Sequence, residues 1–194
     1  MEWEPRDRME LNEQKKEYSA VTRNCFEWVE AVVTSIVVVV LLFTFLFRVV
    51  NVNGQSMEDT IHNEDKVLLT NLFYEPENGD VVVISRAQHF EEPIIKRVIA
   101  TEGQTVDVRS NGDGTATVYV DGMALSEPYI NETMLEVYGG TEFPLTVGKD
   151  CVFVMGDNRN HSTDSRTTIV GMVDGRRVLG RVILRLSPFT TDFD

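Results

Sequence analysis

Residues 31–47 form a run of seventeen uncharged and mostly apolar side chains, which restricts the possible folds more than any other feature of the chain. As an α-helix the run would be about 26 Å long, close to the hydrocarbon thickness of a bilayer. A buried strand or a core helix is the alternative, but strands in soluble proteins seldom exceed about ten residues. A cleavable signal peptide is disfavoured by the thirty residues that precede the run and by the lack of a small-residue cleavage pattern after it. The sequence therefore predicts a transmembrane helix over residues 31–47.

Close to this run, lysine and arginine lie mainly on its N-terminal side. After it comes Arg48, and no further basic residue follows until Lys66. Segments rich in lysine and arginine stay in the cytoplasm. We therefore expect a single-pass protein of the cell membrane, with residues 1–30 as a cytoplasmic tail and residues 48–194 outside. The basic residues before the run are Arg6, Arg8, Lys15, Lys16 and Arg23.

The composition excludes several classes of function. The chain carries 31 acidic and 18 basic side chains, for a formal net charge of −13. Such a chain lacks the cationic surface that binds a phosphate backbone, so we expect no nucleic-acid partner. Two cysteines cannot build a disulfide scaffold or a four-cysteine zinc site. No glycine-rich phosphate loop precedes a helix, so no nucleotide cofactor is expected.

The remainder of the chain has the pattern of an antiparallel β-protein, in which short apolar or alternating runs are separated by glycine-containing turns. The segment Asn111–Gly114 is a hairpin signal. We expect a mainly β domain whose first sheet runs from about residue 49 to 102 and resumes after Gly156, with residues 105–154 inserted as a smaller, hairpin-rich region. The predicted strands are 67–69, 80–84, 94–100, 105–109, 115–120, 151–155 and 181–186.

Ser56 is the first residue of chemical interest. It follows a short linker, residues 48–55, which spans only about 28 Å when fully extended. The linker would therefore hold the serine near the bilayer surface. The alternative interpretation is an ordinary loop hydroxyl.

The predicted strand 94–100 carries two adjacent cations, Lys96 and Arg97, which point to opposite faces of the strand. Both faces are otherwise largely apolar, so we expect one of the cations to be desolvated. A buried lysine can become neutral near physiological pH, whereas an arginine cannot, and a neutral lysine can act as a general base toward a serine. The strand pattern alone favours the alternative, in which Lys96 reaches solvent along a sheet edge.

Residues 156–166 follow an apolar strand and are dense in hydrogen-bonding side chains, which must satisfy one another if they are buried. We expect Asp157 or Asp164 to bind Arg159 or Arg166. A calcium loop would place Arg159 at a ligand position, so no metal site is expected here.

Four segments occur in order behind the predicted anchor. They are Gly54-x-Ser56-Met57-x-x-Thr60-Ile61, Gly79-Asp80-Val81-Val82, Lys96-Arg97-Val98-Ile99-Ala100 and Gly156-Asp157-Asn158-Arg159-x-x-Ser162-x-Asp164-Ser165-Arg166. Together they resemble the conserved boxes of bacterial type I signal peptidases, of the short, single-anchor kind found in Gram-positive bacteria. The resemblance covers nearly everything after the anchor.

The resemblance implies a serine endopeptidase that removes N-terminal signal peptides by means of a serine–lysine dyad. By position, Ser56 corresponds to the nucleophile and Lys96 to the general base. Ser162 corresponds to the hydroxyl that orients the lysine, and Asp164 with Arg166 to a supporting ion pair. The Ser56 N–H would be one oxyanion donor.

The resemblance also implies the partners: signal-peptide-bearing preproteins, membrane lipid and the export machinery, with no cofactor. A preprotein would bind as an extended strand at a sheet edge. We expect Met57 and Ile95 to line shallow pockets for the small residues before the cut. Asp59 stands where the family usually has proline, and its carboxylate would either raise the lysine pKa or only cap a turn.

Three other interpretations compete with this one. A Ser-His-Asp triad would have to use one of the three histidines, none of which lies in a triad motif; they are His62, His89 and His161. A self-cleaving repressor-type protease also uses serine and lysine, but such proteins are soluble. From a different class, the chain would be a catalytically silent, membrane-anchored β-domain that acts as a binding module.

Overall fold

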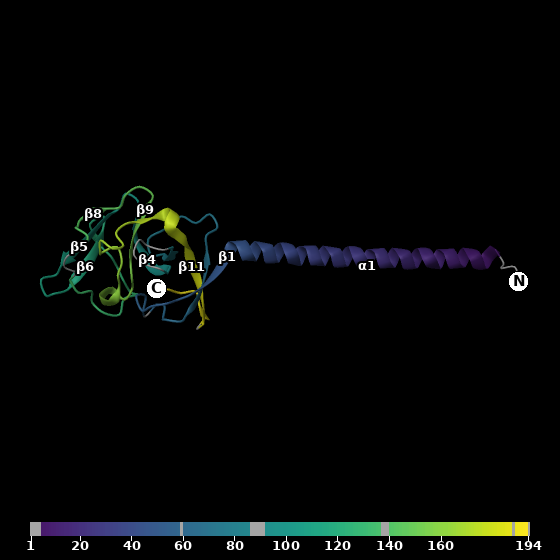
Figure 1. The fold of residues 1–194 in the computed structure, drawn as a ribbon, viewed down its shortest axis with the longest axis horizontal. Helices are drawn as coiled ribbons and strands as arrows, with labels where there is room; N and C mark the ends of the chain where they lie inside the picture. The colour runs from purple at the N-terminus through teal and green to yellow at the C-terminus, as the bar shows by residue number, and fades with distance from the viewer. Residues whose placement is uncertain (1–4, 59, 86–91, 137–139, 188, 194) are drawn as a thin grey trace. The chain divides into compact units, whose positions relative to one another are not determined.

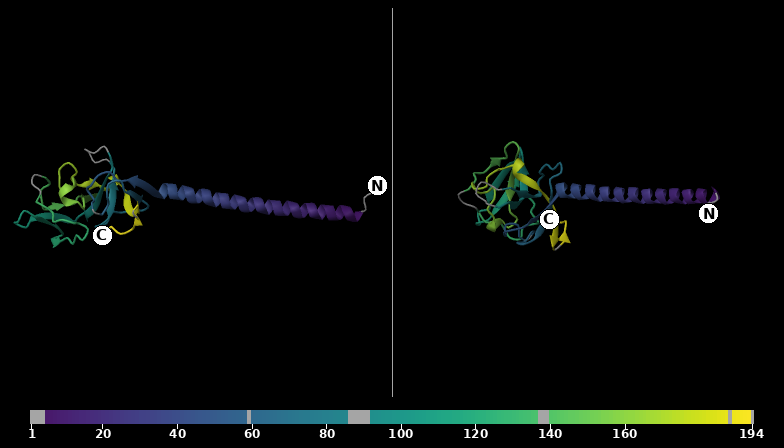
Figure 2. Two further views of the ribbon diagram at one scale, coloured as in Figure 1. Left: turned by 90° about the horizontal axis from the view of Figure 1, so that it is seen from below. Right: turned by 45° about the vertical axis from the view of Figure 1, so that its right-hand side comes forward.

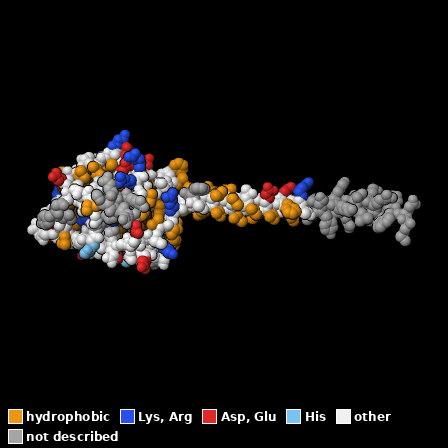
Figure 3. Space-filling model, viewed as in Figure 1, with side chains coloured by type: hydrophobic (Ala, Val, Ile, Leu, Met, Phe, Trp, Pro, Cys, Tyr) orange, Lys and Arg blue, Asp and Glu red, His pale blue; other side chains and the backbone are white. Residues whose placement is uncertain are grey.

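The computed structural model describes residues 5–58, 60–85, 92–136, 140–187 and 189–193, in two units, residues 1–45 and 46–194. Helix α1 runs without a break from Pro5 to Leu46, as Figures 1 and 2 show. Within it Thr22–Thr44, with a mean hydropathy of 2.2, is long and apolar enough to cross a membrane. Figure 3 shows the apolar side chains along this part of the helix. The apolar stretch begins earlier than predicted because its three charged residues, Arg23, Glu27 and Glu30, are isolated from one another within it.

The larger sheet of the second unit has eight strands among the described residues, all paired antiparallel. Their order is β1-β2-β11-β3-β4-β9-β10, and β12 pairs with β11. The strands are β1 (Phe47–Asn51), β2 (Lys66–Thr70), β3 (Val81–Ile84), β4 (Ile94–Thr101), β9 (Cys151–Met155), β10 (Val173–Asp174), β11 (Val178–Ser187) and β12 (Phe189–Thr190).

The smaller sheet has the order β7-β6-β5-β8, and three of its strands lie together in Figure 1. The predicted hairpin joins β5 to β6, and Asn111 N–H donates to Thr115 O across its turn at 2.9 Å. Gly112 and Gly114 have φ angles of +81° and +89° there, a backbone conformation that favours glycine. The strands are β5 (Thr105–Ser110), β6 (Ala116–Val120), β7 (Met123–Ala124) and β8 (Leu145–Thr146). The mainly β, antiparallel fold class with one N-terminal apolar helix is therefore confirmed.

Strand β9 differs from the sequence prediction, which placed residues 151–154 in the inserted region. It pairs with β4, with Arg97 opposite Met155, and so belongs to the larger sheet. Its alternate side chains pack in two different clusters: Val154 contacts the core around Val98, and Phe153 contacts the core that includes Val118 of the smaller sheet. Because both faces are buried, its apolar run does not reveal which sheet it joins.

The chain between α1 and Ser56 also differs from the predicted free linker. Residues 47–51 form strand β1, which pairs with β2 from Phe47 opposite Thr70 to Asn51 opposite Lys66. Only residues 52–55 separate this strand from Ser56. Ser56 is therefore attached to the rigid edge of the sheet.

Candidate active site

Ser56 begins a tight turn after strand β1. Glu58 N–H donates to Gln55 O at 3.2 Å and Ile61 N–H donates to Met57 O at 2.9 Å, which makes this segment a short helical turn. Met57 and Ile61 are 2% and 0% exposed, in a core cluster with Val52 and Val67. The buried side chains fix the turn and leave the Ser56 side chain half-buried beside strand β4.

Lys96 lies within β4, where six consecutive residues are buried. Its side chain is 3% exposed and that of Arg97 is 1% exposed, so both cations are desolvated, whereas the sequence predicted only one. Lys96 Nζ donates to Ser56 Oγ at 2.6 Å and to Ile95 O at 2.9 Å. The alternative in which Lys96 reaches solvent is therefore wrong, and the fold joins two side chains forty positions apart.

Burial sets the ionisation of this amine. Desolvation lowers the pKa of Lys96 from 10.5 to about 8, because the interior disfavours the ammonium form. The carboxylates of Asp164 and Asp157 oppose this shift, and the positive charge of Arg166 assists it. A large fraction of the amine is consequently neutral in mildly alkaline solution.

Asp164 and Arg166 form a buried ion pair behind this amine. Arg166 Nε and Nη2 donate to the two Asp164 oxygens, both at 2.8 Å, and Gly156 N–H donates to the same carboxylate at 3.0 Å. Burial by itself would raise the Asp164 pKa, but the hydrogen bonds and charge of Arg166, with a contribution from the Gly156 N–H, hold it below the ordinary value of 3.8. Asp164 therefore remains ionised, and the two residues stiffen the segment that contains Ser162.

Gly156 allows this segment to approach the turn of Ser56. A Cβ atom at position 156 would lie 2.3 Å from Ser162 Oγ and 2.3 Å from Ser56 O. Asn158 N–H donates to that same Ser56 oxygen at 3.1 Å. The predicted role of Ser162, to orient the lysine, stays a prediction; within the described residues its buried Oγ has no hydrogen-bond partner. Ser162, Arg159 and Arg166 also border a cavity of about 300 Å³.

The Arg97–Asp157 pair is a component of the site that the sequence analysis missed. Arg97 Nε and Nη2 donate to the Asp157 carboxylate at 2.9 and 2.8 Å, and Thr60 Oγ1 donates to it at 2.6 Å. Asp157 thereby links strand β4 to the turn of Ser56. Arg159, which the sequence analysis considered as a partner for Asp157 or Asp164, forms an ion pair with Glu127. The sequence did contain a signal for this pair. Arg97 lies on the strand face opposite Lys96, and an arginine buried on that face requires an acidic partner.

Met57 and Ile95 have a structural role in the core. They are 2% and 8% exposed and pack in the same hydrophobic cluster. That they line substrate pockets stays a prediction. Asp59 lies outside the described residues, as does His89.

The competing Ser-His-Asp triad and a metal site can also be compared with the described part of the chain. The ring of His62 contacts Asp65 and Arg185, whereas the Ser56 hydroxyl contacts Lys96. Across the described residues, no group of three histidine, cysteine, aspartate or glutamate side chains is arranged to hold a metal ion. The chemistry that this arrangement offers is proton transfer between an amine and an alcohol.

The chain is similar to known proteins over most of its length. The sequence profile of the family described as "Signal peptidase, peptidase S26" matches residues 25–187. A signal peptidase I from Bacillus licheniformis is 33% identical over 176 residues, which cover 84% of this chain and 89% of that protein. Signal peptidase I T from Bacillus subtilis (strain 168) is 30% identical over 177 residues, 87% of this chain and 88% of that protein.

A solved structure was also found, a signal peptidase I from Enterococcus faecalis V583. It covers 56% of this chain and 97% of that chain, with 30% sequence identity and a TM-score of 0.44. The family profile spans more than half of the chain, and residues 56, 96, 162, 164 and 166 lie within the matched range. On the strength of that match and of the sequence relatives, the chain belongs to the signal peptidase family, peptidase S26.

Proposed function

We propose that the protein is a membrane-anchored serine endopeptidase that removes N-terminal signal peptides from exported preproteins. Ser56 is the nucleophile and Lys96 is the general base. The observation that carries this proposal is the 2.6 Å separation between a buried lysine amine and a serine hydroxyl. The named activity of the relatives, signal peptidase I, supports the choice of substrate.

The proton transfers follow from the contacts of the amine. A neutral Nζ that donates to Ile95 O keeps its lone pair available for the Ser56 hydroxyl proton. Ser56 Oγ attacks the scissile carbonyl carbon as Nζ takes the proton. The resulting ammonium then protonates the leaving amine, which yields an acyl-enzyme. A water molecule, deprotonated by the same amine, hydrolyses this ester and regenerates Ser56.

The surrounding residues support these steps by holding the dyad in place. The Ser56 N–H is the proposed donor to the tetrahedral oxyanion, where stabilisation is usually a large part of catalysis. Asp164 and Arg166 fix the segment that contains Ser162. We assign the Ser162 hydroxyl the role of orienting the Lys96 amine. Burial of the amine suits this chemistry because it favours the neutral form of the lysine.

The substrate reaches this site as an extended segment that pairs with a sheet edge, so that side chains one and three positions before the cut point toward the enzyme. Met57 and Ile95 are the proposed walls of these pockets. Helix α1 is the proposed anchor, with residues 1–30 in the cytoplasm and residues 48–194 outside, where the membrane lipid and the export machinery are the further partners.

The direct test is cleavage of a preprotein by the full-length protein in phosphatidylglycerol–phosphatidylethanolamine vesicles. We expect a single cut after an alanine that has a second alanine two positions before it, as read by mass spectrometry. Replacing the alanine at the cut with phenylalanine should slow cleavage about tenfold or more, because a shallow pocket cannot accept the ring. No cleavage would favour the binding-module interpretation, and a cut at many unrelated bonds would contradict the substrate assignment.

The pH dependence of cleavage tests the lysine base. Only the neutral amine accepts the serine proton, and the pKa of Lys96 is about 8. The rate constant kcat/KM should therefore rise about tenfold per pH unit below this value and level off above it. The measurement is a profile from pH 6 to 10 on a preprotein without histidine near the cut. A flat profile between pH 6 and 9 would be incompatible with this base.

A further inference from the structure

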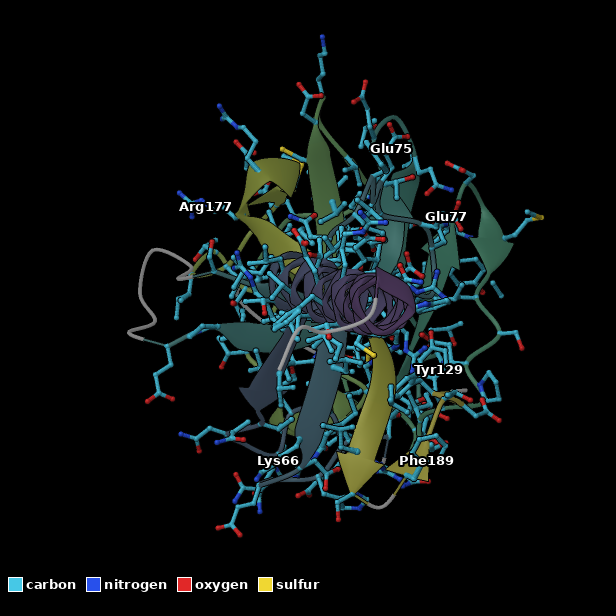
Figure 4. All side chains as sticks on the ribbon, turned by 90° about the vertical axis from the view of Figure 1, so that its right-hand side faces the viewer. Lys66, Glu75, Glu77, Tyr129, Arg177 and Phe189 are labelled. Atoms are coloured by element: carbon cyan, nitrogen blue, oxygen red, sulfur yellow. The ribbon has the colours of Figure 1, made fainter. Side chains whose placement is uncertain are left out.

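Tyr129 lies where strand β4, the segment after β9 and the connection after β7 meet. Its ring centroid is 3.8 Å from Arg97 Cζ and 5.8 Å from Arg159 Cζ, within the range of cation–π attraction. Figure 4 labels Tyr129, which lies in a dense group of side chains. We propose that the Tyr129 ring is a positioning residue for Lys96, which it holds in register with Ser56 by packing against Arg97. This inference rests on the proposed function.

The guanidinium of Arg97 needs such a partner. Its N–H groups donate in the plane of the group to Asp157, to Gly79 O at 2.9 Å and to Phe193 O, so its polar edge is occupied. The two faces of a guanidinium form no such bonds, and with Arg97 only 1% exposed they are out of contact with water. An aromatic face stabilises this charge where another apolar group would not.

Arg97 is covalently adjacent to Lys96, and successive strand residues point to opposite faces. Fixing the Arg97 guanidinium on one face therefore limits the rotation of the strand that would move Nζ away from Ser56 on the other. A strand that could rotate would also admit water to the amine, whose lowered pKa depends mainly on its burial.

The same ring also contacts the other half of the site through Arg159. Arg159 Nε donates to Gly156 O at 3.0 Å, and Arg159 O accepts from Arg166 Nη2 at 2.6 Å. Tyr129 Oη donates to Glu127 at 3.2 Å, and Glu127 in turn pairs with Arg159. Tyr129 thus connects the smaller sheet to both segments that hold the dyad. This gives the inserted region a function in catalysis without contact with the substrate.

The experiment compares full-length Tyr129→Leu and Tyr129→Phe in vesicles, with kcat, KM and the pH profile of preprotein cleavage as readouts. Tyr129→Leu should lower kcat about tenfold with little change in KM, because the loss corresponds to one buried cation–π contact. It should also move the midpoint of the profile up by about half a pH unit or more, because water reaches the amine. Tyr129→Phe keeps the ring and removes only the hydrogen bond to Glu127, so it should retain most of the activity and the same pH midpoint. Tyr119→Leu is the matched control, since Tyr119 stacks on Arg109 at 4.2 Å in the smaller sheet.

A series of ring substitutions at position 129 keeps the proposal testable if Tyr129→Leu does not fold. Phenylalanine with increasing fluorination at position 129 keeps the ring shape but withdraws the negative charge from its face. We expect kcat to fall stepwise with fluorination. The proposal is wrong if kcat and the midpoint stay constant across the series, or if Tyr129→Phe loses as much as Tyr129→Leu, which would assign the effect to the hydroxyl. Activity that survives Ser56→Ala would instead overturn the proposed function itself.

Discussion

Replacing Lys96 with methionine is expected to abolish preprotein cleavage, with a loss in kcat/KM of at least about 10³-fold. Methionine keeps the length and apolar character of the side chain but removes the nitrogen that lies 2.6 Å from Ser56 Oγ. Without a base the hydroxyl keeps its proton and is a poor nucleophile. Ser56→Ala should cause a loss of the same size, and the double variant should be no worse than either alone, because the two side chains act as one unit.

The matched control is Lys66→Met, since Lys66 is exposed on strand β2. It should cleave like the unmodified protein. The melting temperature of Lys96→Met should not fall, because removing a buried amine removes a desolvation cost. Cleavage by Lys96→Met within about tenfold of the unmodified protein, with intact folding, would contradict the assignment of the base.

Gly156→Ala is expected to lower kcat/KM about 10²-fold although it adds a single methyl group. The new Cβ would lie 2.3 Å from both Ser162 Oγ and Ser56 O, and the second of these is backbone. One of the two segments must retreat by about 1 Å, and a misplacement of that size at a reacting centre costs about 10²-fold in rate. The same preprotein assay measures the effect, and circular dichroism checks the fold.

Gly148→Ala is the control for this change. A Cβ at position 148 would meet Met172 Sδ at 3.9 Å, an ordinary contact, so activity should be unchanged. If Gly156→Ala cleaved within about threefold of the unmodified protein, the close approach of the two segments would not be what positions the dyad.

Much of the fold could be predicted because its elements have local patterns. The uncharged run predicts a helix, and strands β2 to β6, β9 and β11 correspond to short apolar or alternating runs between turns. Strand β1 was missed because its first residue, Phe47, is also the last residue of the apolar run, and because the next residue is Arg48. The strands β7, β8, β10 and β12 contain two residues each, too few for a period to appear.

The candidate site was predictable only in part. Ser56 and Lys96 were identified by their place in ordered motifs, since neither residue is unusual in its local sequence. The choice among acidic partners for the arginines could not be made, because several aspartates and arginines lie within one polar segment. Asp157 pairs with Arg97, and Asp164 pairs with Arg166. Arg159 pairs with Glu127, which lies in the connection after β7.

The sequence by itself determined the helix and most of the longer strands of this protein, because strand alternation and helix length depend on neighbours along the chain. Only the tertiary structure decided that β9 joins β4, that both Lys96 and Arg97 are buried, and that Tyr129 packs against Arg97. These facts depend on pairings between distant segments. Such pairings fix the burial of the amine, and burial is what lowers its pKa to about 8.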